Sequence, residues 1–391
     1  MRRLQLMVIA VVLVVAGCSG SGTGRPAVNA RRHDVTRPAT RRLVASWSRA
    51  LHGGPGGAAA DRAGVVVSTG DDTVVALDDA GRERWSVPVP GAGLGWPVLG
   101  GGVVVVPTLR DDRGPGGCVA LDRRNGKRLW AYEEPDAQGV AVALAGDRVV
   151  CALGNGVVVA VDRTTGLRRW REMFEAGGPR SAVSISERTA LAVDAATGVV
   201  AFSARAEAGW YVELLDLGTG KERGAFDFST VGPVSAPVAT APGVLAVGVS
   251  RSREVCALDL RRMRVGACAA APVPDGFDPA SIPLVSGGLI VIAARDGSVT
   301  AIDIEAMRVR WSARVDAPIL GARPVVGGGV VMFDDWTRVP WAVHLADGSA
   351  VEIPKGQGWV VATVADAHGG FEVAKRDMHG GWIERWVPTS D

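Results

Sequence analysis

The stretch "CVALDRRNGKRLWAYEEP" (residues 118–135) joins a small apolar run ending at Asp122 to a turn through Asn125 and Gly126, followed by Trp130. The same pattern recurs in "VVALDDAGRERWSVP" around Asp78 and Trp85, in "VVAVDRTTGLRRWRE" around Asp162 and Trp170, and in "VTAIDIEAMRVRWSA" around Asp303 and Trp311. The stretch is therefore one copy of an internal repeat, and the repeat decides the fold.

The period of the repeat is about forty residues. Aligned on the aspartate, the copies stand at Asp78, Asp122, Asp162, Asp216, Asp259, Asp303 and, more loosely, Asp347. Glycine turns divide each unit into short strands, which in the third unit we expect at Gly139–Leu144, Arg148–Leu153, Val157–Asp162 and a run reaching Trp170. Four antiparallel strands repeated at this period predict an all-β propeller.

The two ends of the repeat region predict how the ring closes. Three strand-like runs follow Gly358 and would form a last blade that lacks one strand. The segment "LVASWSRAL" (Leu43–Leu51) reads as the missing outer strand, with Trp47 in the tryptophan position of the repeat. We therefore predict one domain over residues 43–391, an eight-bladed propeller closed by an N-terminal strand, with seven blades as the alternative.

The repeated aspartates and tryptophans are predicted to be structural. An aspartate at the start of a turn can accept backbone N–H groups two or three residues further on. A tryptophan on the outer strand can cover the seam between neighbouring blades and satisfy its one N–H group there. This applies to Asp78, Trp85, Asp122, Trp130, Asp162, Trp170, Asp303 and Trp311, none of which is predicted to be catalytic.

The N-terminal residues predict export. Arg2 and Arg3 precede an apolar run, Leu6 to Ala16, that is too short to cross a bilayer but has the length of a signal-peptide core. The run ends in Val-Ala-Gly-Cys, which resembles the bacterial lipobox. This resemblance implies removal of residues 1–17 and lipidation of Cys18; the alternative is ordinary secretory cleavage near Gly17. We expect an extracytoplasmic protein anchored to the cell membrane.

Residues 18–42 are predicted to be the lipidated cysteine followed by a flexible basic tether. The segment from 19 to 42 carries six arginines and one aspartate, a net charge of +5, against +2 for the whole chain. Its start, "SGSGTG", has too little apolar surface to fold. Such an arm beside a lipid anchor either contacts anionic headgroups or serves as a solvated spacer, and both interpretations stay open.

The motif V-A-L-D-x-x-x-G-x-x-x-W at residues 119–130 resembles the PQQ-like (quinoprotein) β-propeller repeat, and the resemblance covers residues 43–391. Units four and five depart from it, with Gly224 and Ala267 in the tryptophan position. Lipobox, tether, closing strand and eight repeats together resemble the lipoprotein B family of the outer-membrane β-barrel assembly machinery. The resemblance implies a non-catalytic scaffold in the cell envelope that binds a partner protein through loops on one face, and we expect that partner to be an envelope or membrane protein. We expect a monomer that binds no nucleic acid.

The same repeat occurs in PQQ-dependent dehydrogenases, so a PQQ-, quinone- or small-ligand-binding propeller with oxidoreductase or sensing activity is the alternative. The resemblance to those enzymes implies adjacent cysteines over the cofactor, and this chain has no Cys-Cys pair. No recognised ligand spacing occurs among His33, His52, His344, His368 and His379. We therefore predict no catalytic, cofactor-binding or metal-binding residues.

Four cysteines remain after Cys18, in a compartment that permits disulfides. Cys256 and Cys268 flank one predicted turn and stand nearly opposite each other on adjacent strands, whereas Cys118 and Cys151 fall in neighbouring blades. A Cys256–Cys268 disulfide and four free thiols are both open, because a shift of one residue in register would turn the side chains apart.

The predicted partner-binding surface is the face that carries the variable loops. Turns between the third and outer strands are short and uniform, whereas loops between the second and third strands vary and carry charge beside aromatic residues. Binding sites concentrate on such loops, although they are open to interpretation as tolerated insertions. The candidate residues are Arg110, Asp111 and Asp112 in one loop and Asp334, Asp335, Trp336, Arg338 and Trp341 in another. Trp336 is preferred over Trp341, which could instead pack inward.

Overall fold

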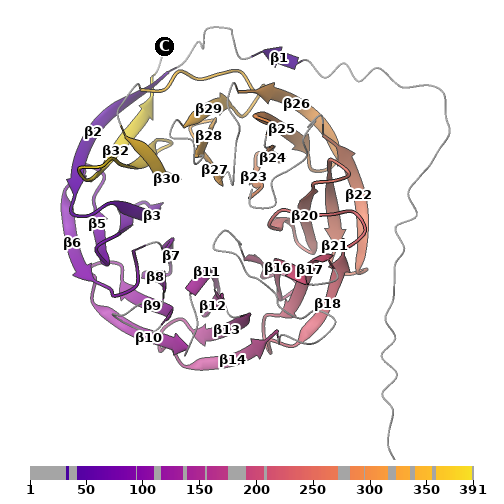
Figure 1. Cartoon of the computed structure of the whole chain (residues 1–391), viewed down its shortest axis with the longest axis horizontal. Helices are drawn as coiled ribbons and strands as arrows, with labels where there is room; N and C mark the ends of the chain where they lie inside the picture. Colours follow the sequence, from indigo (N-terminus) through magenta and orange to yellow (C-terminus); the bar gives the residue numbers. More distant parts are fainter. Residues whose placement is uncertain are drawn as a thin grey trace, which may run out of the picture.

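The computed structural model shows a ring of eight antiparallel sheets (Figure 1), which confirms the predicted eight-bladed, all-β propeller. The structure describes residues 32–34, 42–93, 95–109, 116–134, 139–154, 156–174, 191–206, 209–271, 282–294, 296–315, 323–334, 340–354 and 358–389. Among these residues, no helix is long and apolar enough to cross a membrane.

The first four blades are four-stranded meanders whose first strand faces the central channel (Figure 1). Blade 1 contains β3 (Pro55–Asp61), β4 (Gly64–Thr69), β5 (Thr73–Leu77) and β6 (Glu83–Pro88). Blade 2 contains β7 (Val98–Gly100), β8 (Val103–Thr108), β9 (Gly116–Asp122) and β10 (Arg128–Glu134). Blade 3 contains β11 (Gly139–Ala145), β12 (Arg148–Leu153), β13 (Val157–Asp162) and β14 (Arg168–Met173). Blade 4 contains β15 (Ala192–Asp194), β16 (Val199–Ala206), β17 (Gly209–Asp216) and β18 (Glu222–Asp227).

The later blades depart from this plan in two places. Blade 5 contains β19 (Val238–Ala241), β20 (Val244–Val249), β21 (Glu254–Asp259) and β22 (Arg264–Ala270). Blade 6 contains β23 (Leu284–Ser286), β24 (Leu289–Ala293), β25 (Ser298–Asp303) and β26 (Arg308–Arg314), and β1 (Arg32–Asp34) pairs parallel with its outer strand. Blade 7 contains β27 (Arg323–Gly327), β28 (Val330–Asp334) and β29 (Trp341–His344), with an isolated bridge from Val343 to Ala350 at the outer position.

Blade 8 closes the ring. It contains β30 (Trp359–Ala365), β31 (Phe371–Arg376), β32 (Gly381–Pro388) and, as its outer strand, β2 (Leu43–Leu51). Leu43 pairs with Pro388 and Leu51 with Gly381, so the strand predicted to close the ring does so over its whole length.

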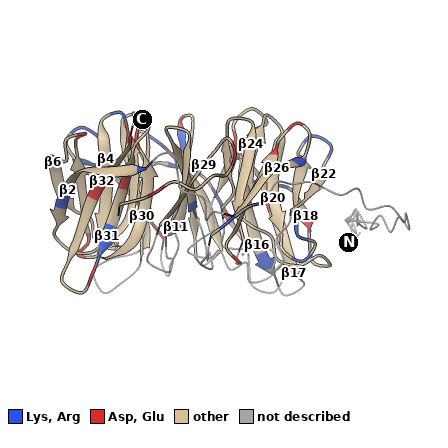
Figure 2. Ribbon diagram, turned by 90° about the horizontal axis from the view of Figure 1, so that it is seen from above, with Lys and Arg blue, Asp and Glu red and all other residues tan. Residues whose placement is uncertain are grey.

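The hydrophobic core is divided among the seams between blades. Each of eight buried clusters joins two neighbouring sheets, and one of them contains Leu51 and Ile383 of blade 8 together with Val65 and Leu77 of blade 1. Charged residues lie mainly at strand ends and turns (Figure 2). Each sheet therefore buries both faces against its neighbours, which explains the nearly continuous apolar runs such as Val157–Val161.

Candidate interaction face

The repeated aspartates fix the turns between the third and outer strands. In blade 3, Oδ1 of Asp162 accepts hydrogen bonds from the N–H groups of Thr164 (3.0 Å) and Thr165 (2.9 Å), and Oδ2 pairs with Arg169. The backbone bond from Thr165 and the Arg169 guanidinium hold the pKa of Asp162 below its ordinary value. Equivalent backbone bonds reach Asp78, Asp122, Asp216, Asp259 and Asp303. These carboxylates are bonded within their own turns.

In blade 7 the structure places His344, and not Asp347, at the aspartate position. The His344 N–H donates to the carbonyl of Ser349, and the Gly348 N–H donates to the carbonyl of His344, the same pair of bonds that Asp122 makes in blade 2. Asp347 lies inside the turn, where it accepts the Ser349 N–H. The loose alignment on Asp347 was therefore three residues late, because the sequence offers an aspartate within the turn itself.

The tryptophans cover the seams between blades. Trp130 is 7% exposed, and its indole Nε1 donates to the carbonyl of Arg163 in the next blade at 2.8 Å. Its ring lies on Gly166, whose φ is +71° and where an added Cβ would stand 2.6 Å from the ring. Trp47, Trp85, Trp170 and Trp311 donate in the same way to Asp79, Arg123, Leu217 and Leu345.

The seams of blades 4 and 5 and of blades 5 and 6 are among those that lack the tryptophan, and both carry a methionine in place of the facing glycine. Gly224 faces Met263 and Ala267 corresponds to Met307, and these two methionines have φ of 50° and 44°. A Cβ added to Gly224 would stand 2.8 Å from the methionine Cε. The methionine side chain, reaching from the turn, therefore occupies the space that a tryptophan would fill from the outer strand.

The loop face lies opposite these turns. The structure describes two of the predicted binding residues there: Asp334 ends β28, and Trp341 begins β29. Arg110, Asp111, Asp112, Asp335, Trp336 and Arg338 lie outside the described residues. Because these loops belong to blades 2 and 7, blades 8 and 1 stand between them on the ring. The strands that flank these loops are therefore not adjacent on the ring.

Trp341 packs inward, the possibility that made Trp336 the preferred contact residue. Its half-buried ring contacts the cluster that includes Phe333 and Val343 at the seam of blades 6 and 7. Its buried Nε1 has no hydrogen-bond partner among the described residues. The ring is therefore mainly part of the core.

A pair of residues that the sequence did not single out lies on the loop face at the mouth of the channel. The guanidinium carbon of Arg323, at the start of β27, stands 4.2 Å from the ring centroid of Trp96, which precedes β7. Ser68 holds this segment, because its Oγ donates to the carbonyl of Gly95 at 2.5 Å and accepts the N–H of Gly57 at 3.0 Å. The stacked pair links blade 7 to the passage between blades 1 and 2. Trp96 does not occupy the tryptophan position of the repeat. This departure was the one feature of the sequence that could have drawn attention to it.

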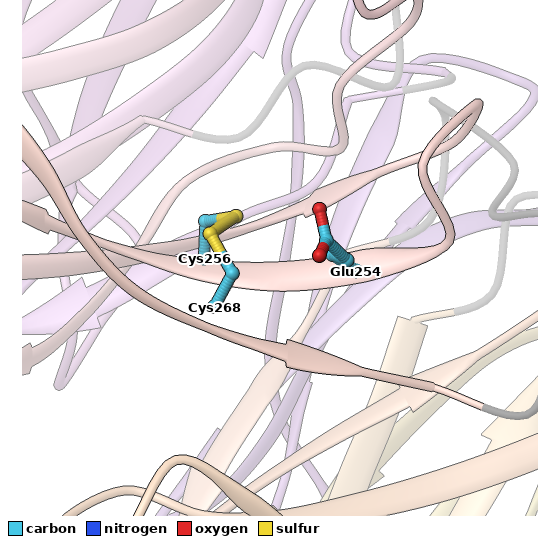
Figure 3. Close-up of side chains that lie close together, drawn as sticks. All are labelled: Glu254, Cys256 and Cys268. Carbon is cyan, nitrogen blue, oxygen red and sulfur yellow. A yellow bond between two sulfur atoms is a disulfide. The ribbon is translucent and has the colours of Figure 1, made fainter. Parts of the chain in front are cut away.

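The structure contains two disulfides. Cys118–Cys151 joins β9 to β12 across the seam of blades 2 and 3, and Cys256–Cys268 joins β21 to β22 within blade 5. Glu254 lies beside the second disulfide (Figure 3), and its carboxylate and the two sulfurs lie within 4.8 Å of one another. It is the one group of three potential metal ligands among the described residues.

These features define the chain as a β-propeller of PQQ-like repeats, with uniform turns on one face and variable loops on the other. The family model described as "Outer membrane protein assembly factor BamB" matches residues 32–209 and 208–352, and the chain belongs to this family. The family is one of assembly factors, in agreement with the prediction that the chain is not an enzyme.

Two curated relatives carry the same description. The protein from Nitrosomonas eutropha is 30% identical over 122 residues, which are 30% of this chain and 29% of the relative. The protein from Bordetella pertussis is 30% identical over 119 residues, which are 29% of this chain and 30% of the relative. The matched segment therefore spans less than a third of each relative.

Solved structures show the same fold. BamB from Moraxella catarrhalis is 17% identical, with a TM-score of 0.60 over 88% of this chain and 97% of its own. Quinohemoprotein alcohol dehydrogenase from Comamonas testosteroni is also 17% identical, with a TM-score of 0.62 over 88% of this chain and 76% of its own. At this identity both likenesses concern the fold alone.

Proposed function

We propose that this protein is a lipid-anchored, extracytoplasmic scaffold of the bacterial cell envelope that binds a membrane protein through its loop face. The family match supports an assembly role, and the division of the ring into a uniform face and a variable face supports the placement of the partner. The observation that carries the proposal is that the aspartates and tryptophans of the repeat are committed to turns and seams. The repeat supplies a rigid frame, and recognition is left to the loops.

Residues 1–17 serve in this proposal as the signal peptide, Cys18 as the lipidated first residue and the segment up to residue 42 as the tether. Replacing Cys18 by alanine should leave unprocessed precursor or release the protein into the medium, because the acyl chains supply the membrane affinity. Detergent phase partitioning of the parent and the Cys18→Ala variant measures this. If the variant partitions into detergent as the parent does, the anchor is elsewhere.

The partner-binding loop is tested by replacing Asp335, Trp336 and Arg338 together with alanine. Tryptophan and arginine dominate interface energetics, so the variant should lose capture of the membrane partner while its melting temperature stays near that of the parent. Affinity purification from membranes, quantified by mass spectrometry, provides the measurement. The matched control replaces Arg124 and Lys127, which are exposed on the opposite face, and should leave capture unchanged.

Equal recovery of the same partners by the loop variant and the control would refute the assignment of the binding face. The alternative of a cofactor-binding propeller is tested separately, by adding PQQ and calcium to the purified protein and recording its absorbance. A scaffold predicts no bound chromophore after desalting, whereas a quinone-binding propeller predicts a stoichiometric one.

A further inference from the structure

The group formed by Glu254, Cys256 and Cys268 lies on one hairpin of blade 5 (Figure 3). Cys256 of β21 pairs directly with Cys268 of β22 in the ladder, with their Cα atoms 4.1 Å apart. Glu254 stands two residues before Cys256 on the same strand, so both side chains leave the same face of the sheet. The backbone register thus brings two sulfurs and a carboxylate together at one place.

Small residues open this place to solvent. Cys268 is exposed, Glu254 is half-buried and Cys256 is 3% exposed. The outer strand here reads "RVGACAA", and the exposed Ala270 stands opposite Glu254 in the ladder. By contrast, both cysteines of the Cys118–Cys151 disulfide are fully buried. A reagent or an ion in solution can therefore approach Cys256 and Cys268 more readily than Cys118 and Cys151.

We propose that Glu254, Cys256 and Cys268 form a redox-gated site for a thiophilic divalent cation such as zinc. Thiolate sulfur with a carboxylate oxygen is a donor set that zinc accepts in tetrahedral geometry, and three protein ligands leave one position for water. Two sulfurs bound to one zinc ion lie roughly 3.8 Å apart, given Zn–S bonds of about 2.3 Å and a tetrahedral angle. Neighbouring strands of the hairpin can span this separation.

The oxidation state of the two cysteine sulfurs decides whether the site can bind a cation. In the oxidised protein the two sulfurs are bonded to each other, so neither is available as a thiolate ligand. A dithiol reductant opens the site: its two thiols become a disulfide, and two electrons and two protons pass to the protein, giving two cysteine thiols. On binding the cation, both thiols release their protons and the site gains two thiolate ligands.

Opening this disulfide should leave the fold in place. It closes a loop with a sequence separation of 12 inside one hairpin, whose strands are already paired from Glu254 with Ala270 to Asp259 with Arg264. The seam of blades 4 and 5 is also held by a buried cluster that includes Phe226, Leu245 and Leu258. The reduced hairpin therefore keeps the register on which the site depends.

Cobalt(II) provides the test, because its visible and near-ultraviolet bands report thiolate ligation and tetrahedral geometry. The purified chain is titrated with cobalt(II) in its oxidised form, and again after reduction with a phosphine that is then removed. We expect one bound ion per reduced chain with thiolate charge-transfer absorption, no such absorption in the oxidised chain, and displacement of cobalt by zinc.

Three variants separate this site from its surroundings. Reduced Cys268→Ser should lose the charge-transfer absorption of the two-thiolate site, and Glu254→Gln should weaken binding by about tenfold or more. Glu305→Gln, an exposed carboxylate change on the neighbouring blade, should bind as the parent does. The inference is overturned if the reduced parent shows no thiolate absorption, if Cys268→Ser retains the absorption of the parent, or if Glu254→Gln binds as tightly as the parent.

Discussion

Exchanging a seam tryptophan for the methionine arrangement found elsewhere in the ring tests how the blades are held together. Trp130→Ala removes a ring that is 7% exposed and its 2.8 Å hydrogen bond to Arg163. Deleting a buried tryptophan side chain costs about 3–5 kcal/mol, and leaving the carbonyl without its donor is part of that cost. Gly166→Met alone should also destabilise, by about 1–3 kcal/mol, because its Cβ would meet the indole at 2.6 Å.

The double variant should be more stable than the sum of the single changes predicts. Trp130→Ala with Gly166→Met reproduces the Ala267 and Met307 arrangement of blades 5 and 6, in which the methionine side chain fills the seam from the turn. We expect a coupling free energy of at least about 1 kcal/mol in favour of the double variant. Urea unfolding of the parent and the three variants, followed by circular dichroism, gives the four free energies of unfolding.

Additive free energies in this cycle would show that the methionine does not replace the tryptophan in the seam. A cost below about 1 kcal/mol for Trp130→Ala would show that the ring is exposed and unpaired, because such a ring loses little on truncation. Trp85→Ala supplies a second seam with the same geometry, and its cost should lie close to that of Trp130→Ala.

Two further changes address groups outside the interaction face. Burial raises the pKa of Glu372, which is 2% exposed, from 4.5 to about 8. As the pH rises, the unfolded chain loses this proton before the folded chain does. The free energy of unfolding should therefore fall between pH 4.5 and pH 8. Glu372→Gln should flatten that decline in urea titrations at several pH values, and an unchanged slope would contradict it. Replacing Cys118 and Cys151 by alanine should cost about 2–4 kcal/mol of stability by thermal unfolding, because their disulfide ties blade 2 to blade 3; a melting temperature equal to that of the parent would show that the seam holds without it.

The sequence predicted the architecture well because every unit of the repeat forms the same local hydrogen bonds and packing contacts. Each copy of the aspartate turn and the outer tryptophan makes the same local bonds, so one unit predicts the others, and Leu43–Leu51 was recognisable by Trp47 in the expected place. Where a unit changed its residues, the prediction weakened. The backbone bonds of the blade 7 turn place His344 at the aspartate position, and packing between blades 4 and 5 places a methionine in front of Gly224. A single copy of the motif reveals neither.

The loop face was less predictable, because its residues do not repeat. Trp96 and Arg323 are 227 positions apart in the chain and meet only because the ring brings the start of blade 7 close to the passage into blade 2. The grouping of Glu254 with two cysteines likewise depends on the exact register of one hairpin. The contact of Trp96 with Arg323 follows from the closed ring and the group at Glu254 from a local register, and the period of the sequence predicts neither.

The closing strand has a consequence for how the protein is made. Leu43–Leu51 emerges from the ribosome early, yet its hydrogen-bonding partner, Gly381–Pro388, is synthesised more than three hundred residues later. Until then the first strand has no sheet to join, and both edges of the growing ring stay open to pairing with other chains. A chain arrested during synthesis or export cannot complete its last blade. Closure therefore acts as a check on completeness, and truncated products should remain substrates for chaperones and proteases.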